Sequence, residues 1–147
     1  MPEVKQSWFN RKNVDYETPD YIFKPLDDEF GFTLDVCASK ENTKCHRYFT
    51  KLDNGLEQQW AGEICWMNPP FGREMKRWII KAYQESLLGA VVVALLPSRT
   101  NTAWWHDYVE KGMVRFIRGE VKFKGYERGL WMPMCIVIWK GGEVTNV

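Results

Sequence analysis

Asn68-Pro69-Pro70-Phe71 is the stretch of sequence from which we interpret the chain. It follows an apolar run at residues 63–67 that is typical of a short buried strand, and a helical pattern comes after it. The four residues are therefore expected on the turn at the C-terminal end of a strand. In open α/β sheets, ligands bind at the carboxyl ends of the strands.

This turn is rich in hydrogen-bond acceptors. Asn68 offers a side-chain carbonyl oxygen, while Pro69 and Pro70 fix φ and remove two backbone N–H donors, so that carbonyl oxygens are left to accept. Phe71 adds a planar ring. Together they suit an exocyclic amino group on a flat heterocycle, because the acceptors would orient its nitrogen. The alternative is a proline-stiffened loop without a ligand, so the flanking sequence has to decide.

Length and charge restrict the class of protein. At 147 residues the chain is expected to form one domain, which is short for an enzyme that holds a cofactor and a macromolecule. We place an N-terminal arm at residues 1–14 and the domain at residues 15–147. Residues 1–71 carry 8 Lys and Arg against 12 Asp and Glu, whereas residues 72–147 carry 12 against 7. A polyanion would therefore meet the C-terminal half.

Cysteine usage and hydropathy argue against other classes. The four cysteines include no CxxC pair, and Cys65 and Cys135 lie in apolar, strand-like runs, so we expect a reducing, cytoplasmic compartment. Cys45 and His46 are adjacent, but the chain has one further histidine only, and we predict no metal site. No signal peptide opens the chain and no run approaches 18 apolar residues, so we expect neither export nor contact with a membrane.

Strand-like and helix-like patterns alternate along the chain. A helix is predicted to begin with Thr18 as its N-cap and Pro19 as its first residue, and Pro25 would end it early. The alternation predicts an α/β fold whose sheet is mostly parallel, with an antiparallel pair at its C-terminal edge. The predicted strands lie at 30–38, 63–67, 90–96, 114–117 and 134–139, and the other helices at 75–89 and 102–112.

Two acidic residues fall where a ligand would bind. Asp35 comes at the end of the first predicted strand, where a carboxylate can accept hydrogen bonds from hydroxyl or ammonium groups. The alternative for Asp35 is the N-cap of a following helix. Asp53 stands in an Asp-Asn-Gly sequence, so it either reaches a ligand or initiates a turn. The GxGxxG loop of dinucleotide-binding folds is absent after Asp35.

The order of these elements and motifs resembles the class I methyltransferases that use S-adenosylmethionine. Within them it is similar to the phage-type DNA N-6-adenine methyltransferase family. The resemblance covers roughly residues 15–140. The segments that carry it are Thr18-Pro19, residues 32–39 (FTLDVCAS), residues 48–50 (YFT), residues 53–56 (DNGL), residues 66–72 (WMNPPFG), residues 95–100 (LLPSRT) and residues 104–107 (WWHD).

This resemblance implies a minimal Rossmann-like class I methyltransferase fold, S-adenosylmethionine as the methyl donor, no metal, and double-stranded DNA as the partner. Catalytic roles fall on the four residues of the turn, Asn68, Pro69, Pro70 and Phe71. The residues implied to bind S-adenosylmethionine are Thr18, Pro19, Asp35, Ala38, Asp53 and Asn68.

The chain departs from the broader methyltransferase pattern after its first strand. No glycine follows Asp35 to let backbone approach the methionine part of the donor. Only about 25 residues separate Asp35 from Trp60, too few for the two further strands of a full-sized member. The sheet is therefore expected to be shortened between the first strand and the turn at 68–71. Asp53 is the best substitute for the acid that usually holds the ribose.

No separate target-recognition domain is visible in the sequence. Contacts to DNA therefore have to come from the N-terminal arm, from the loops that carry Arg99, Arg118 and Lys122, or from the second subunit of a homodimer. For each of these three cations the alternative is an ordinary surface charge.

The resemblance also implies a mechanism. Adenine N6 is a poor nucleophile and is buried in a duplex, so the base must be flipped out. The Asn68 side-chain oxygen and the Pro69 carbonyl would accept the two N6 hydrogens, and Phe71 would stack on the ring. Two alternatives stay open: an RNA or protein-glutamine methyltransferase with the same turn, and a catalytically silent module that binds nucleic acid through exposed Trp rings.

Overall fold

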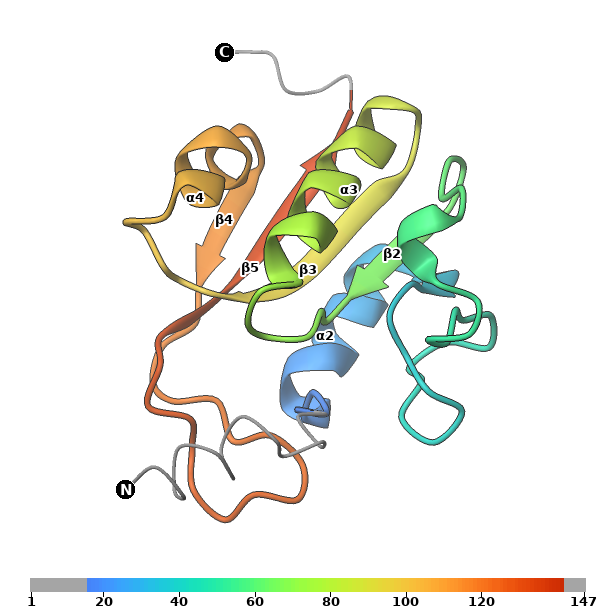
Figure 1. The fold of residues 1–147 in the computed structure, drawn as a ribbon. Coiled ribbons are helices and arrows are strands. Elements are labelled where there is room, and N and C mark those ends of the chain that lie inside the picture. The colour runs from blue at the N-terminus through green and yellow to red at the C-terminus, as the bar shows by residue number, and fades with distance from the viewer. Residues whose placement is uncertain (1–15, 142–147) are drawn as a thin grey trace.

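A five-stranded sheet forms the centre of the structure, a computed structural model that describes residues 16–141 (Figure 1). The strand order is β1-β2-β3-β5-β4. The first three strands are parallel, and β5 runs antiparallel to both of its neighbours, β3 and β4. The strands are β1 (Leu34–Asp35), β2 (Ile64–Met67), β3 (Val91–Pro97), β4 (Met113–Phe116) and β5 (Met134–Lys140). The predicted α/β class is thereby confirmed, in a mixed sheet that is parallel over its first three strands and antiparallel at β5 and β4, the predicted antiparallel C-terminal part.

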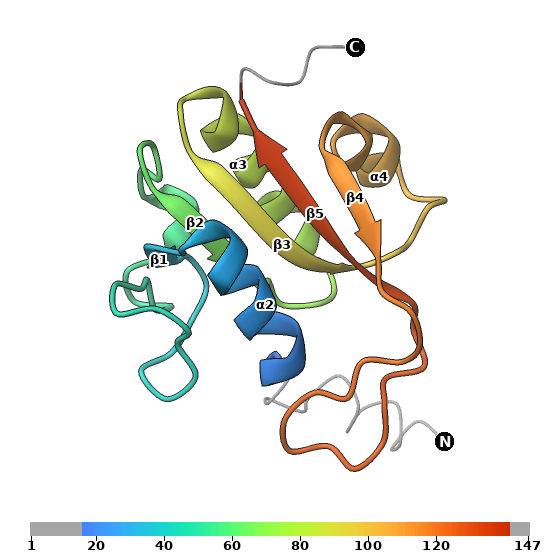
Figure 2. The same cartoon turned by 180° about the vertical axis from the view of Figure 1, so that it is seen from behind.

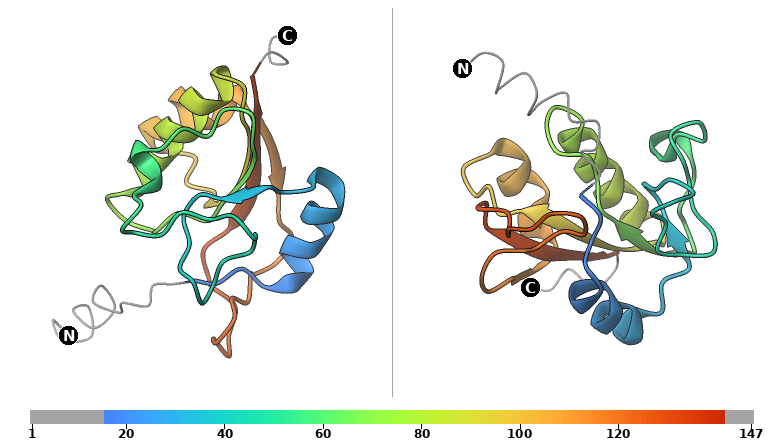
Figure 3. Two further views of the ribbon diagram at one scale, coloured as in Figure 1. Left: turned by 90° about the vertical axis from the view of Figure 1, so that its right-hand side faces the viewer. Right: turned by 90° about the horizontal axis from the view of Figure 1, so that it is seen from below.

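Helices cover both faces of this sheet (Figure 3). Helix α2 (Asp20–Phe30) packs on one face, and Figure 2 shows it lying over β2 and β3. Helix α3 (Met75–Leu87) and the short α4 (Ala103–Asp107) pack on the other face. The apolar side chains that α2 buries are Ile22, Phe23 and Leu26, and those that α3 buries include Met75, Trp78, Ile79 and Ala82.

The parallel strands bring three turns to one edge of the sheet. Asp35 pairs in register with Trp66, and Met67 pairs with Ala94, so the C-terminal ends of β1, β2 and β3 point the same way. The segments that follow Asp35, Met67 and Pro97 therefore start from the same edge. The predicted N-terminal arm, residues 1–14, lies outside the described residues. None of the helices within residues 16–141 is long and apolar enough to cross a membrane.

The start of α2 differs from the prediction. Pro19 is the N-cap residue in place of Thr18, and no side chain caps the helix. The Thr18 hydroxyl accepts a hydrogen bond from Asn68. Pro25 does not end the helix, which continues to Phe30 and stops at Gly31 with φ 68°. Proline within a helix removes one backbone hydrogen bond. We attribute the survival of α2 to the burial of its apolar stripe against the sheet.

Two further elements are shorter than predicted. Strand β1 spans two residues instead of nine, because its predicted start belongs to α2 and the chain bends away after Val36. The predicted helix at 102–112 is divided at Tyr108 into α4 and a 3₁₀ turn, η2 (Val109–Lys111). The Tyr108 carbonyl accepts a hydrogen bond from the Trp139 indole at 2.9 Å, which ties this break to β5.

The segment between β1 and β2 includes a second 3₁₀ turn, η1 (Gly55–Glu57), and Gly55 packs directly against the end of β1. A Cβ at Gly55 would lie 2.3 Å from the Val36 carbonyl oxygen and 3.1 Å from the Trp78 ring. We expect Gly55→Ala to lower the free energy of unfolding by about 1–3 kcal/mol, as overpacked sites do. Urea denaturation measures this, with the exposed Glu57→Ala as the control. Equal midpoints for the two variants would show that the segment yields without cost.

Candidate functional site

Asn68 is the first residue after β2, and its side-chain amide is held in one orientation. Its Nδ2 donates to the Tyr16 backbone carbonyl at 2.6 Å and to the Thr18 hydroxyl at 3.1 Å. The Tyr16 carbonyl can only accept, so it must face the amide nitrogen. Within residues 16–141 no group donates a hydrogen bond to Asn68 Oδ1. The acceptor predicted from the sequence is therefore available to a ligand.

Thr18 is structural as well as polar. Its side chain is 1% exposed, and it is one of four buried polar or charged residues in the described chain. Because the Thr18 hydroxyl accepts a hydrogen bond from Asn68, the start of α2 and the end of β2 are joined at the site. The neighbouring Pro19 is buried too, and its carbonyl accepts hydrogen bonds from the N–H groups of Ile22 and Phe23.

Aromatic rings surround Phe71. The Tyr16 ring lies 5.0 Å from Phe71, 5.1 Å from Phe123 and 5.3 Å from Tyr126, measured between ring centroids. Phe123 also meets Phe71 edge-on at 6.5 Å. These rings fix Phe71 on one side, so its position depends on residues before α2 and in the loop between β4 and β5.

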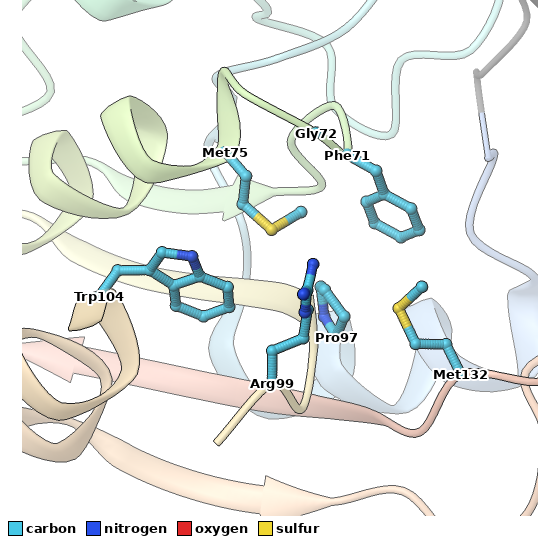
Figure 4. Close-up of a pocket in the computed structure, with 7 residues that line it drawn as sticks. All are labelled: Phe71, Gly72, Met75, Pro97, Arg99, Trp104 and Met132. Carbon is cyan, nitrogen blue, oxygen red and sulfur yellow. The ribbon is translucent and has the colours of Figure 1, made fainter. Parts of the chain in front are cut away.

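A small, shallow pocket with a volume of about 60 Å³ opens on the other side of Phe71. That is well below the usual volume of ligand sites. Its walls come from the turns after β2 and β3, from the starts of α3 and α4, and from the β4–β5 loop. Figure 4 shows the side chains around a common space, with Arg99 extending into it. The lining residues are Phe71, Gly72, Met75, Pro97, Arg99, Trp104 and Met132.

Asp35 is buried at the end of β1 and holds the loop that follows. Its side chain accepts hydrogen bonds from the backbone N–H groups of Cys37 at 3.3 Å and Lys44 at 2.9 Å. No helix starts here, so the N-cap alternative is wrong. Burial raises the pKa of Asp35 to about 7, against the lowering effect of the two N–H donors and of the Lys44 charge. The contact of Asp35 with S-adenosylmethionine stays a prediction.

Asp53 and Ala38, which were also expected to bind S-adenosylmethionine, make hydrogen bonds within the loop after β1 in this structure. The Asp53 carboxylate accepts hydrogen bonds from the backbone N–H and hydroxyl of Thr50, at 2.8 and 3.1 Å, which is the turn-initiating alternative. The Ala38 N–H donates to the Phe49 carbonyl at 3.0 Å. Among residues 16–141, no three His, Cys, Asp or Glu side chains gather closely enough to hold a metal ion.

Glu17 connects the site to two loops. Its carboxylate pairs with Lys44, in the loop after β1, at 3.1 Å and with Lys124, in the β4–β5 loop, at 3.6 Å. The Lys124 N–H also donates to the Glu17 carbonyl at 3.0 Å. The segment that orients Asn68 is therefore fixed from both sides of the sheet edge.

Three exposed cations, Arg99, Arg118 and Lys122, form what we call the basic rim. Arg99 lines the pocket, and Arg118 follows β4, whose end Phe116 is level with Leu96 across β5. The Lys122 N–H donates to the Tyr21 hydroxyl at 3.1 Å, beside the start of α2. Within the described residues none of the three has an acidic partner. Unpaired cations at this edge are free to meet an anion.

Comparison with known proteins decides the family of this site. The chain matches the family DNA N-6-adenine-methyltransferase (Dam) over residues 6–140, most of its length. The chain belongs to the Dam family. The Dam resemblance and its enzyme class, the adenine-specific DNA methyltransferases, are thereby confirmed.

Two phage proteins are similar to this Dam-family chain. A DNA N-6-adenine-methyltransferase of Haemophilus phage HP1 is 29% identical over 117 residues, which cover 71% of this chain and 67% of the phage protein. A DNA N-6-adenine-methyltransferase of Escherichia phage T1 is 25% identical over 130 residues, which cover 71% of this chain and 54% of the phage protein. The chain thus spans little more than half of the T1 protein.

Sequence reasoning missed part of the site. It assigned no role to Tyr16, and it named neither Met75 nor Met132 as a wall of a pocket. Trp104 entered only as a residue that carries the resemblance. A signal for Trp104 was present, since Thr102 is a favourable N-cap residue that follows the end of β3 closely and so predicts that a helix begins near this edge.

Proposed function

We propose that this Dam-family chain transfers the methyl group of S-adenosylmethionine to the N6 amine of an adenine flipped out of double-stranded DNA. The observation that carries the proposal is the Asn68 Oδ1, which has no hydrogen-bond donor within residues 16–141, on a side chain that Tyr16 and Thr18 hold on the turn that also carries Phe71. A fixed acceptor beside an aromatic wall is what an exocyclic amine on a flat base requires. Because such a substrate is DNA, we place the enzyme in the cytoplasm.

Two acceptors orient the amine in this proposal. Asn68 Oδ1 takes one N6 hydrogen and the Pro69 carbonyl, which also has no donor within residues 16–141, takes the other. The nitrogen lone pair, otherwise delocalised into the ring, then points at the methyl group. The N6–carbon bond forms as the sulfur–carbon bond breaks, and N6 releases one proton to solvent. Alignment of two reactants lowers a barrier by roughly 7–11 kcal/mol in favourable systems, so Asn68 needs no basic partner.

The base-binding wall follows from the pocket. Phe71 and Trp104 offer ring faces, while Met75 and Met132 offer flexible apolar contacts that adapt to a flat ligand. Arg99 reaches into the same space, and its guanidinium can pair with an anion. We assign the apolar walls to the flipped base and Arg99 to the phosphate of its nucleotide.

We propose that a positively charged methyl donor, which would supply an electrophilic methyl group on sulfur, lies at the same edge of the sheet. The ends of β1 and β2 are neighbours, and the buried Asp35 carboxyl there has a raised pKa that a nearby cation would lower. We assign Thr18 and Pro19, at the start of α2, and the backbone near Ala38 to this side of the site. Asp53 would contact the donor only after release from Thr50.

Labelled methyl transfer tests the proposed function. The purified chain is incubated with labelled S-adenosylmethionine and unmethylated duplex DNA, single-stranded DNA, RNA or a glutamine-containing protein, and the nucleosides are separated. We expect N6-methyladenine from duplex DNA. Label in RNA or protein alone supports the second kind of enzyme. No transfer and no heat of S-adenosylmethionine binding in calorimetry supports a silent binding module. Sedimentation of the DNA complex tests whether a homodimer forms.

Arg99→Ala is expected to weaken binding to duplex DNA for all sequences, because a phosphate contact carries no base information. The slope of log affinity against log salt concentration should become shallower by roughly one unit. Fluorescence anisotropy from 50 to 300 mM salt measures the slope, and Lys76→Ala, an exposed cation of α3, is the control. An unchanged slope in the Arg99 variant would put the duplex on another face.

A further inference from the structure

Trp131 is a large apolar side chain that is 66% exposed, in the β4–β5 loop. No ring contact with Trp131 occurs among residues 16–141, although aromatic pairs are frequent in the rest of this part of the chain. An indole held in water gives up the stabilisation that burial would contribute. A partner from outside residues 16–141 would recover that stabilisation.

The segment that carries Trp131 is anchored on both sides. The Leu130 N–H donates to the Val121 carbonyl at 2.8 Å, and the Pro133 carbonyl accepts from the Ser98 N–H at 2.8 Å. Leu130 packs into the core beside α2. The indole is thus presented by a fixed backbone that is joined to the turn after β3.

The residue next to Trp131 is Met132, which lines the pocket between Phe71 and Trp104. An exposed aromatic ring therefore stands one residue from the space that the proposed function assigns to the flipped adenine. The same loop, residues 117–133, carries Arg118 and Lys122 of the basic rim and is basic overall, with four Lys or Arg side chains against Glu120 and Glu127. Basic groups and an exposed ring together suit a nucleic acid, whose phosphates and bases they can contact at once.

We propose that Trp131 inserts into the DNA duplex at the place that the target adenine leaves when it is flipped out. Apolar side chains that enter a base step compensate for part of the lost stacking. The ring would keep the gap closed to the returning base while the neighbouring Met132 meets the base in the pocket. This inference rests on the proposed function and assigns a positioning role to Trp131, which touches no reacting atom.

The test compares two DNA substrates. The target adenine is first located by sequencing plasmid DNA that the wild-type chain has methylated. A duplex with this adenine paired to thymine is then compared with one that has an abasic site opposite the adenine, where little pairing opposes flipping. We expect Trp131→Ala to lower kcat/KM on the paired duplex by about tenfold or more, the scale of one aromatic–base stack. On the abasic duplex we expect a loss of less than about threefold.

Two further variants separate insertion from a structural role. Trp131→Phe keeps a ring and should restore most of the activity on the paired duplex. Leu88→Ala removes an apolar side chain that is 67% exposed, just before the start of β3 at the opposite edge of the sheet. This variant should keep the wild-type kcat/KM on both duplexes. Melting temperature and S-adenosylmethionine affinity should match the wild type in all three variants.

Three results would overturn the inference: wild-type kcat/KM for Trp131→Ala on the paired duplex, an equal loss on both duplexes, or no recovery in Trp131→Phe. The proposed function fails in a different way, since a wild-type chain that methylates no DNA would contradict it before any Trp131 variant is made. If the wild type methylates DNA and Trp131→Ala has the same kcat/KM on the paired duplex, only the insertion of Trp131 is contradicted.

Discussion

Asn68→Ala is expected to lower kcat for methyl transfer by about 100- to 1,000-fold, the usual cost of losing one hydrogen-bond acceptor or donor that acts in the transition state. The side chain is only partly buried, and the apolar residues beneath it, Trp66 and Met67, are unchanged by the substitution. We therefore expect a folded protein that retains most of its affinity for S-adenosylmethionine. Single-turnover methylation of duplex DNA measures the loss, and isothermal calorimetry measures donor binding.

Thr18→Val separates the orientation of Asn68 from its presence. The substitution keeps the shape of a side chain that is 1% exposed and removes the hydroxyl that accepts from Asn68 Nδ2. The Tyr16 carbonyl still holds the amide, so we expect a smaller loss of kcat than for Asn68→Ala, and Thr18→Ser should recover the wild-type kcat.

Activity of Asn68→Ala above about a tenth of wild type would contradict the role given to Oδ1.

Local sequence predicted the turn because its determinants are local. Residues 68–71 follow a buried strand and include two prolines, and the apolar run before Pro97 is continuous, so both strand ends could be placed without knowledge of the fold. The parallel register then follows from the alternation of strands and helices. The chemistry at Asn68 was accessible for the same reason.

The partners of Asn68 were beyond local reasoning. Tyr16 lies 52 residues and Thr18 50 residues before it, and local sequence offered Thr18 the competing role of a helix cap. In the folded chain the Thr18 hydroxyl bonds the distant Asn68 amide and does not cap the helix. The pocket is a similar case, because its walls come from four separate segments, and Met132 lies in a loop without periodicity.

Asp35 shows a different reason for a missed role. The sequence suggested a ligand contact or a helix cap, and the cap alternative assumed that the next residues form a helix. The chain instead turns back, so that the Lys44 N–H, nine residues later, reaches the carboxylate. A loop of this shape leaves no repeating pattern in the sequence. The consequence for the protein is a buried acid whose ionisation is coupled to folding.

Asp35→Asn is expected to remove a pH dependence of stability that is present in the wild type. The pKa of Asp35 is about 7 in the folded chain against an ordinary value of 3.8, because burial disfavours the carboxylate. A raised pKa stabilises the fold fully below pH 3.8, and this contribution is lost as the pH rises towards 7. The loss approaches roughly 1.4 kcal/mol for each pH unit, about 4 kcal/mol in all.

The measurement is the difference in free energy of unfolding between wild type and Asp35→Asn, from urea denaturation between pH 4 and 8. Every other titrating group is shared by the two proteins, so its contribution cancels in the difference. We expect the wild type to lose stability relative to the variant as the pH rises, with a plateau above pH 7. A difference that stays constant would mean that the carboxylate is ionised throughout, because the N–H groups of Cys37 and Lys44 outweigh burial. With saturating S-adenosylmethionine, a cation bound near Asp35 should favour the carboxylate and flatten the same curve.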